Sequence, residues 1–356
     1  MTDATTTTTD ATTTTSRPAA PRPGGAVGGP APRTMRAAVF HEHGGPEVLR
    51  VAEVPVPTPS PDQVLIQVSH AGVNFAEVMF RRGQIGVGLP HVPGLEVAGT
   101  VLEVGAEVTS VVPGDRVAAL TLAGGGGAEL AVAEARHVVV LDGPLAGLSS
   151  AVAAGAVCNV TTAWGAVRLA GRPVAGERVV VLAAAGGVGS AVAALCAAAG
   201  AQVVGVVGSA DKRAALPPDV FAERWTYDEL LASGESFDVV FDAVGGPARA
   251  ALVSRVAVLG RYVVFGDAAR ADTSVELDDV WFSGAAFVGY NLGAVAFGSS
   301  VPLADHMGAA LRSVADGTVP VEPVVLRLED VAEAHRRLEG RETTGKIVLD
   351  LGGVRA

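Results

Sequence analysis

Apolar side chains alternate with polar ones in the first part of the chain, which is typical of strands with one buried face. Turn signals of Gly, Pro and Asp separate five such runs: MRAAVF (35–40), VLRVAEVPVP (48–57), QVLIQVSHAGV (63–73), EVAGTVLEVG (96–105) and VVPGDRVAAL (111–120). The spacing predicts a twisted antiparallel or barrel-like sheet through about residue 142. An alanine-rich stretch from Ser149 to about Ala170 then reads as helical.

Near residue 177 the pattern changes to strands that alternate with helices. ERVVVLAA (177–184) is a continuous apolar run that suits a strand buried on both faces, and SAVAALCAAAGA (190–201) suits a helix. Four further strands are expected: AQVVGVVG (201–208), FDVVFDAVG (237–245), GRYVVFG (260–266) and AAFVGYNLG (285–293). This alternation predicts a parallel sheet with right-handed crossovers.

The last part of the chain, from about Pro302, reads as helix, strand, helix and strand. Its strands, VEPVVLRL (321–328) and GKIVLDL (345–351), are expected to complete the N-terminal β domain, so the αβ domain is an insertion. The predicted boundaries are a disordered tail over 1–33, a catalytic domain over 34–158 completed by 304–356, and a cofactor domain over 159–303.

Composition narrows the function classes. The chain has 356 residues, is 49% hydrophobic and 18% charged, and carries a net charge of −11 with no basic stripe, which argues against a nucleic-acid partner. The two cysteines, Cys158 and Cys196, form no CxxC pair and the histidines are scattered, so no metal site is expected. G-x-S-x-G and Walker GK[ST] motifs are absent from the sequence, which disfavours hydrolysis.

The sequence also predicts the cellular location of the protein. The Thr/Pro/Gly-rich start has no apolar h-region, and Met35 is a possible true or alternative start. The uncharged stretch Val179–Ala210 is long enough to span a bilayer, but its glycines and alanines favour a strand, a turn and a buried helix. We therefore expect a cytoplasmic protein with no membrane partner.

A small-residue loop marks the cofactor site. The predicted strand runs into Ala184-Ala185-Gly186-Gly187-Val188-Gly189, and a helix follows at once. This is the G-x-G-x-x-G arrangement with alanine in the first place. Small residues let backbone N–H groups and the positive helix end reach a pyrophosphate, and Gly189 permits close packing of helix on strand. The context favours a dinucleotide site over a merely structural turn.

The end of the second strand of this sheet distinguishes NADPH from NADH. An NAD site usually places Asp or Glu there, but this strand ends in Gly208-Ser209-Ala210-Asp211-Lys212-Arg213, with the acid two residues late. A hydroxyl and two cations suit a 2′-phosphate, although solvated surface charge is the alternative. Lys212 is one of only two lysines, the other being Lys346. The pattern favours NADPH.

These residues resemble the zinc-independent quinone oxidoreductase branch of the medium-chain dehydrogenase/reductase superfamily, over residues 35–356. The resemblance is carried, in order, by GVNFAEVMFRRG (72–83), VPGLEVAGTV (92–101), PGDRV (113–117), NVTTAWGAV (159–167), AAAGGVGS (183–190), VGSADKR (207–213), FDVVFDAVGG (237–246), VVFG (263–266) and GKIVLDL (345–351). It implies an α/β fold, with a GroES-like β-rich catalytic domain and a Rossmann doubly wound parallel-sheet cofactor domain.

The resemblance also implies roles for particular residues. Asn74 is expected to line the nicotinamide and substrate cleft as the catalytic residue. The further residues expected to contact the cofactor are Thr162, Gly186, Gly187, Val188, Gly189, Ser209, Lys212, Arg213, Tyr227, Phe265 and Gly266. Asn74 also stands where the zinc enzymes carry a cysteine, and their GHE pattern reads Gly94-Leu95-Glu96. Glu96 is therefore expected to be a structural acid or hydrogen-bond acceptor.

Two departures from the family pattern point to an altered cleft. RRGQI places Ile85 where the family usually has a tyrosine, so that proton donor is lacking, and Glu77 replaces an aspartate. We therefore expect hydride transfer from NADPH to a quinone, with the Asn74 amide as a candidate donor to the acceptor oxygen. The alternatives are an enoyl or alkenal reductase, perhaps one that tailors secondary metabolites, and a non-catalytic NADPH-binding sensor or partner protein. A homodimer paired through GRYVVFG and AAFVGYNLG is expected, as in relatives.

Overall fold

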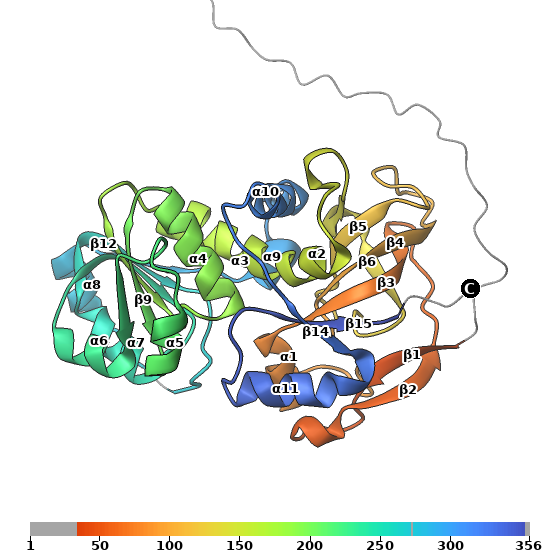
Figure 1. Ribbon diagram of the computed structural model, residues 1–356, viewed down its shortest axis with the longest axis horizontal. Coiled ribbons are helices and arrows are strands. Elements are labelled where there is room, and N and C mark those ends of the chain that lie inside the picture. The colour runs from red at the N-terminus through yellow and green to blue at the C-terminus, as the bar shows by residue number, and fades with distance from the viewer. Residues whose placement is uncertain (1–33, 272, 353–356) are drawn as a thin grey trace, which may run out of the picture. The chain divides into compact units, whose positions relative to one another are not determined.

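The computed structural model describes residues 34–271 and 273–352, and the predicted tail over 1–33 lies outside them. Figure 1 shows a β-rich part at the two ends of the described chain and an αβ part in its middle. The expected fold class is confirmed by this arrangement. Met35 lies in the first strand and is buried.

The β-rich part is built on a mostly antiparallel sheet that the end of the chain completes with a parallel pair of strands. Its strands, in spatial order, are β14 (Val324–Arg327), β15 (Ile347–Asp350), β3 (Gln63–Val73), β4 (Glu96–Val104), β5 (Arg116–Leu120) and β7 (Val138–Val140), with β6 (Leu130–Glu134) on β3. Strands β14 and β15 form the parallel pair, whereas β15 and β3 are antiparallel, with Ile347 opposite Val73. A separate antiparallel pair is formed by β1 (Thr34–Val39) and β2 (Arg50–Pro55).

The αβ part is a six-stranded parallel sheet. Its strands, in spatial order, are β10 (Glu223–Thr226), β9 (Gln202–Val207), β8 (Arg178–Leu182), β11 (Phe237–Asp242), β12 (Val256–Val264) and β13 (Ala286–Gly289). Numbered by sequence within this sheet, the order is 3-2-1-4-5-6, which is that of the dinucleotide-binding fold. The sequence pattern missed β10, because this four-residue strand begins with two charged residues, Glu223 and Arg224.

Helices of the αβ part connect these strands. They are α4 (Gly187–Ala198), α5 (Ala210–Ala215), α6 (Tyr227–Ser233), α7 (Gly246–Val253), α8 (Leu277–Ser283) and α9 (Leu292–Gly298). The other helices are α1 (Phe75–Arg81), α2 (Ser150–Ala156), α3 (Asn159–Gly165), α10 (Leu303–Ala315) and α11 (Val331–Glu339). Short helical turns lie at Pro46–Val48, Ala135–His137, Gly143–Leu145, Ala166–Gly171 and Leu328–Asp330.

The helical segment expected from Ser149 to about Ala170 is confirmed, and it is divided into α2 and α3. Cys158 lies at the break, and its backbone N–H donates to the Glu96 carboxylate at 2.6 Å. Among residues 34–271 and 273–352, no single helix is long and apolar enough to cross a bilayer. Within these residues, one pair of helices, α2 and the helix Asn159–Gly171, is long and apolar enough when the two are counted together. The pair is bent by 41°. Val179–Ala210 forms β8, α4 and β9, as expected.

One buried apolar cluster runs through both sheets. It includes Leu120 of β5, Val160 of α3, Val192 of α4 and Phe241 of β11, and all four side chains are almost completely buried. Burial of such side chains stabilises each by roughly 1.5–3 kcal/mol relative to exposure. This shared core fixes α3 and α4, which carry the residues of the site described next.

Candidate functional site

Asn74 lies where strand β3 gives way to helix α1. It is the residue before the first helical turn, in an extended conformation, and Glu77 accepts a hydrogen bond from its backbone N–H at 2.9 Å. The other oxygen of Glu77 accepts from the Gly94 backbone N–H at 3.0 Å. Glu77 thus fulfils the cap function of the usual aspartate and ties α1 to the start of β4.

The Asn74 side chain is held from three sides in a buried polar cluster. Its Nδ2 donates to Glu96 Oε1 at 2.9 Å and to Glu77 Oε1 at 3.2 Å, and its Oδ1 accepts from Lys346 Nζ at 2.6 Å. Lys346 Nζ also forms an ion pair with Glu96 Oε1 at 2.5 Å. The orientation of the amide is determined by these partners, because the two carboxylates can only accept and the ammonium can only donate. The amide hydrogens point inward, so a substrate oxygen must displace a carboxylate to accept from them.

Burial makes this cluster electrostatically sensitive. Desolvation raises the pKa of Glu77 to about 7, while the Lys346 charge and the Asn74 hydrogen bonds oppose that rise. Desolvation and the nearby carboxylate of Glu96 also raise the pKa of the Cys158 thiol, so Cys158 stays protonated at neutral pH. The expectation that Glu96 is a structural acceptor is confirmed, since it accepts from Asn74, Cys158 and Lys346.

The donor set around Asn74 does not fit a zinc ion. Within the described residues, 34–271 and 273–352, no three His, Cys, Asp or Glu side chains are grouped so as to hold a metal ion. The ammonium of Lys346 already lies against both Asn74 Oδ1 and Glu96 Oε1, where a second cation would be repelled. No step of the chemistry below is derived through a metal.

The glycine loop forms a cradle at the start of α4. Gly186 precedes the helix, and Gly187, Val188 and Gly189 open it. A Cβ on Gly187 would lie 2.2 Å from Asn159 Nδ2, and one on Gly189 would lie 2.3 Å from the Ala183 carbonyl. Gly189 therefore requires glycine, and a larger residue at Gly187 would displace the Asn159 side chain. The free N–H groups of this twelve-residue helix face the loop. The cradle fits the pyrophosphate of a dinucleotide.

The predicted phosphate-binding residues Ser209, Lys212 and Arg213 follow strand β9, but the side chains of Lys212 and Arg213 have different partners. Ser209 Oγ caps α5 and accepts from the Lys212 backbone N–H at 3.3 Å. Lys212 Nζ donates to the carbonyls of Arg341 at 2.5 Å and Thr343 at 3.0 Å. Arg213 instead forms an exposed ion pair with Glu229. Desolvation and then the Arg341 charge lower the pKa of Lys212.

The other expected cofactor residues lie at the carboxyl ends of the parallel strands or beside them. Tyr227 OH accepts from the Ala183 backbone N–H at 3.1 Å, just after β8, and burial raises its pKa. Phe265 and Gly266 follow β12, and the Gly266 carbonyl accepts from Arg249 Nη2 at 2.9 Å. Thr162 Oγ1 donates to the Cys158 carbonyl in α3 at 2.8 Å. Ligands of doubly wound sheets bind at this edge.

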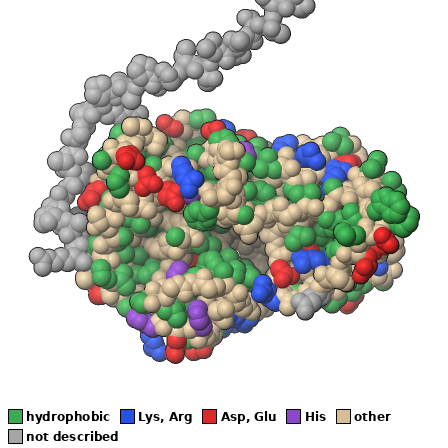
Figure 2. Space-filling view, turned by 180° about the vertical axis from the view of Figure 1, so that it is seen from behind, with side chains coloured by type: hydrophobic (Ala, Val, Ile, Leu, Met, Phe, Trp, Pro, Cys, Tyr) green, Lys and Arg blue, Asp and Glu red, His purple; other side chains and the backbone are tan. Residues whose placement is uncertain are grey.

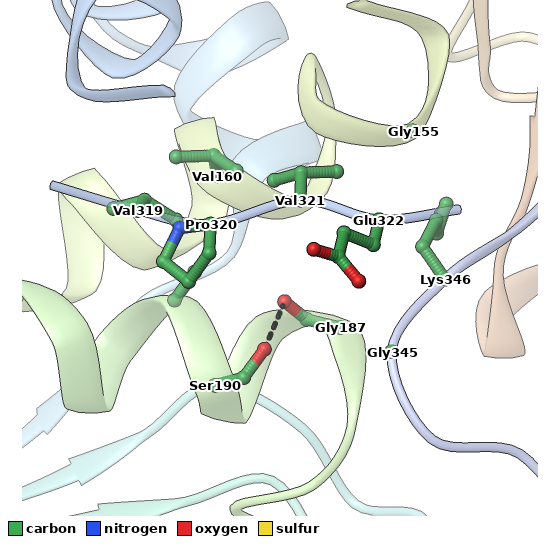
Figure 3. A pocket seen from close by; sticks show the side chains of 11 residues that line it. Gly155, Val160, Gly187, Ser190, Val319, Pro320, Val321, Glu322, Gly345 and Lys346 are labelled. Carbon is green, nitrogen blue, oxygen red and sulfur yellow. Dashed lines mark hydrogen bonds between the residues drawn. The ribbon is translucent and has the colours of Figure 1, made fainter. Parts of the chain in front are cut away.

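A segment near the end of the chain, residues 341–346, contacts three predicted sites at once. The carbonyls of Arg341 and Thr343 accept from Lys212, and the Gly345 N–H donates to the Ala185 carbonyl of the glycine loop at 2.9 Å. Lys346 then reaches Asn74. Figure 3 shows Gly345 and Lys346 beside Gly187 at a small pocket, with the Glu322 side chain extending toward the start of α4. Sequence reasoning singled out Lys346 as a rare lysine but assigned it no role.

Comparison with known proteins agrees with this geometry. Residues 60–147 match the family described as alcohol dehydrogenase GroES-like domain, and residues 219–349 match the one described as zinc-binding dehydrogenase. The chain is 32% identical to the quinone oxidoreductase of Lama guanicoe over 333 residues, covering 89% of this chain and 98% of that protein. It is 31% identical over 307 residues to a mycocerosic acid synthase-like polyketide synthase of Mycolicibacterium smegmatis, covering 83% of this chain.

The chain spans only 14% of the length of that polyketide synthase. Among solved structures, the Escherichia coli quinone oxidoreductase complexed with NADPH aligns with a TM-score of 0.79 at 26% identity, covering 89% of this chain and 100% of that one. The fold of the superfamily binds a nicotinamide cofactor, and the cradle at Gly187 fits one. The chain is an oxidoreductase and belongs to the quinone oxidoreductase branch of the medium-chain dehydrogenase/reductase superfamily.

Proposed function

We propose that this protein transfers hydride from NADPH to a quinone without a metal. The observation that carries the proposal is the pairing of a glycine cradle on α4 with the buried Asn74 cluster, which residues 341–346 join. Support comes from the quinone oxidoreductase relatives, one of which was solved with NADPH.

NADPH is proposed over NADH because of the charges after strand β9. Lys212 and Arg341 bring two positive charges together beside the Ser209 hydroxyl. No acid stands at the end of the strand to accept from a ribose 2′-hydroxyl, since β9 ends at Val207 and Gly208-Ser209 follow. A 2′-phosphate would bond Ser209 and Lys212 and would relieve the repulsion between Lys212 and Arg341.

The residues of this chain bind, orient and shield the reactants. When bound, the cofactor supplies the hydride and its two electrons. The Asn74 cluster is buried, so water is kept from the side of the cleft that it forms, and its hydrogen bonds hold the Asn74 amide in one orientation. Ile85 is 40% exposed and offers no proton, so solvent protonates the product. Quinone reduction tolerates this, because hydroquinone oxygens exchange protons with water.

An enoyl reductase is the second candidate. The observation that favours it is the match to polyketide synthases over 83% of this chain. Such a reaction places hydride on the β-carbon of an α,β-unsaturated carbonyl, and the α-carbon then needs a proton. The loss of the family tyrosine at Ile85 makes this second step harder for the protein. We therefore place quinone reduction first.

Rates of NADPH oxidation on two panels separate the candidates. We expect turnover with 1,4-naphthoquinone and other quinones to exceed turnover with trans-2-hexenal and enoyl thioesters. Faster turnover of the enones and thioesters would assign the protein to the second candidate. NADH should support a lower kcat/KM than NADPH on whichever acceptor is reduced.

The proposed assembly is a homodimer through the edge of the parallel sheet. Strand β13 ends the order of that sheet, and the adjacent helix α8 exposes Trp281 by 75% and Phe282 by 77%. Leu259 of β12 is 74% exposed. It lies near the end of α8, because a Cβ on Gly284 would be 3.1 Å from the Leu259 side chain. Figure 2 shows hydrophobic side chains gathered at the end of the molecule that carries α8. A second copy that pairs β13 with β13 would cover these rings.

A further inference from the structure

Gly345 and Lys346 connect the cofactor cradle to Asn74 within two residues. The Gly345 backbone pairs with the glycine loop, both through its N–H to the Ala185 carbonyl and through a bridge to Gly186. The next side chain, Lys346, is only 5% exposed and contacts Asn74 Oδ1 and Glu96 Oε1. One dipeptide therefore contacts both the glycine loop and Asn74.

We propose that Lys346 is a positioning residue, which holds the Asn74 amide in register with the cofactor cradle for hydride transfer. The inference rests on the proposed function, because it assigns the second lysine of the chain a task in that reaction. It goes beyond the backbone contact by which Gly345 joins this segment to the glycine loop. Hydride transfer is sensitive to small displacements of reacting groups, so a residue that fixes their register affects the rate more than binding.

The contacts of Asn74 show why a cation is needed there. Two carboxylates, Glu77 and Glu96, accept from the same amide nitrogen, which turns the amide oxygen toward Lys346. Without the ammonium, the buried oxygen loses its donor and two buried carboxylates lose their counter-charge. The amide can then rotate or move, and the carboxylates repel each other.

The same geometry gives a pH signature. The charged and titratable groups around Glu77 are Lys346 before β15, Glu96 on β4 and the Cys158 thiol before α3. Glu77 accepts from both Asn74 and Gly94, and its ionised form accepts these hydrogen bonds more strongly. Because the Lys346 charge lowers the pKa of Glu77, its removal must raise that pKa. In the pH profile of kcat, the midpoint of the acidic limb should therefore move to higher pH in Lys346→Met and stay unchanged in Lys346→Arg.

The test compares the full-length wild type with Lys346→Met, Lys346→Arg and the exposed control Arg327→Met. Arg327 forms an ion pair with its neighbour Asp330, and its side chain is 74% exposed. The readouts are the Kd for NADPH by fluorescence titration, and kcat, KM and their pH profiles with 1,4-naphthoquinone or trans-2-hexenal, whichever the wild type reduces faster. If Lys346→Met does not fold, the double variant Lys346→Met with Glu96→Gln, which removes both charges of the ion pair, takes its place and is compared with Glu96→Gln alone.

We expect kcat of Lys346→Met to fall at least about tenfold, on the scale of one lost charge-assisted hydrogen bond. Its Kd for NADPH should change less than about threefold, because the Gly345 backbone contact is retained. Lys346→Arg should recover most of kcat. A loss confined to NADPH affinity, or a kcat profile with an unmoved midpoint in Lys346→Met, would overturn the proposal. If the wild type binds NADPH but reduces neither acceptor, the proposed function fails instead.

Discussion

Lys212 and Arg213 are adjacent in sequence, yet the structure predicts that their removal has different effects on NADPH binding. Lys212 is partly buried and reaches the carbonyls of Arg341 and Thr343, whereas Arg213 is 40% exposed and paired with Glu229. A hydrogen bond to a charged group contributes roughly 1.5–3 kcal/mol, and partial exposure favours the lower half of that range. We take about 1.5–2 kcal/mol for Lys212 toward a 2′-phosphate.

At about 1.4 kcal/mol per tenfold, Lys212→Ala should weaken NADPH binding roughly 10–30-fold and leave NADH binding nearly unchanged. Arg213→Ala should weaken it less than about fivefold, because an exposed pair contributes at most about 1 kcal/mol. The double variant should lose the preference for NADPH. The assay is fluorescence titration of each variant with NADPH and with NADH at fixed ionic strength. An unchanged NADPH/NADH ratio in Lys212→Ala, or a larger loss in Arg213→Ala, would refute the phosphate-pocket assignment.

Three further outcomes are expected from the structure. Turnover should survive dialysis against EDTA, because the Asn74 donor set does not fit zinc; activity lost to the chelator and restored by Zn²⁺ would contradict this. Trp281→Glu should shift the molar mass measured by light scattering from dimer to monomer, and an unchanged mass places the interface elsewhere. The folded-state pKa of Glu77 is raised from 4.5 to about 7, so the free energy of unfolding should fall as pH rises through that window. In Glu77→Gln, the urea midpoint of unfolding should fall less steeply with rising pH than in the wild type. An equally steep fall in this variant would contradict a raised pKa for Glu77.

Local patterns predicted the parallel sheet and the glycine loop, because a buried parallel strand and a tight turn leave local signatures. Strand β8, the loop and α4 are continuous in sequence, so their apolar run and glycines were sufficient. Strand β10 was missed because it is short and charged at the edge of the sheet. The break between α2 and α3 was missed because its cause, the bond from Cys158 to Glu96, joins residues 62 positions apart.

The site could be predicted only as far as its residues follow the sequence motifs. Asn74 and Glu96 were identified, but their shared partner Lys346 lies 272 positions from Asn74. The ion pair between Arg213 and Glu229 could not be predicted either, because the sequence around Arg213 does not indicate Glu229 as its partner. Long-range electrostatic partners depend on the topology that brings β15 beside β3, which no local pattern records.

The most direct test of hydride transfer is the single-turnover oxidation of NADPH deuterated at the transferred position of C4, with 1,4-naphthoquinone as acceptor and the full-length protein in excess. The account predicts enzyme-dependent oxidation that is slower for the deuterated cofactor than for ordinary NADPH, in the presence of EDTA. No oxidation above the uncatalysed rate with either the quinone or trans-2-hexenal, despite bound NADPH, would contradict it.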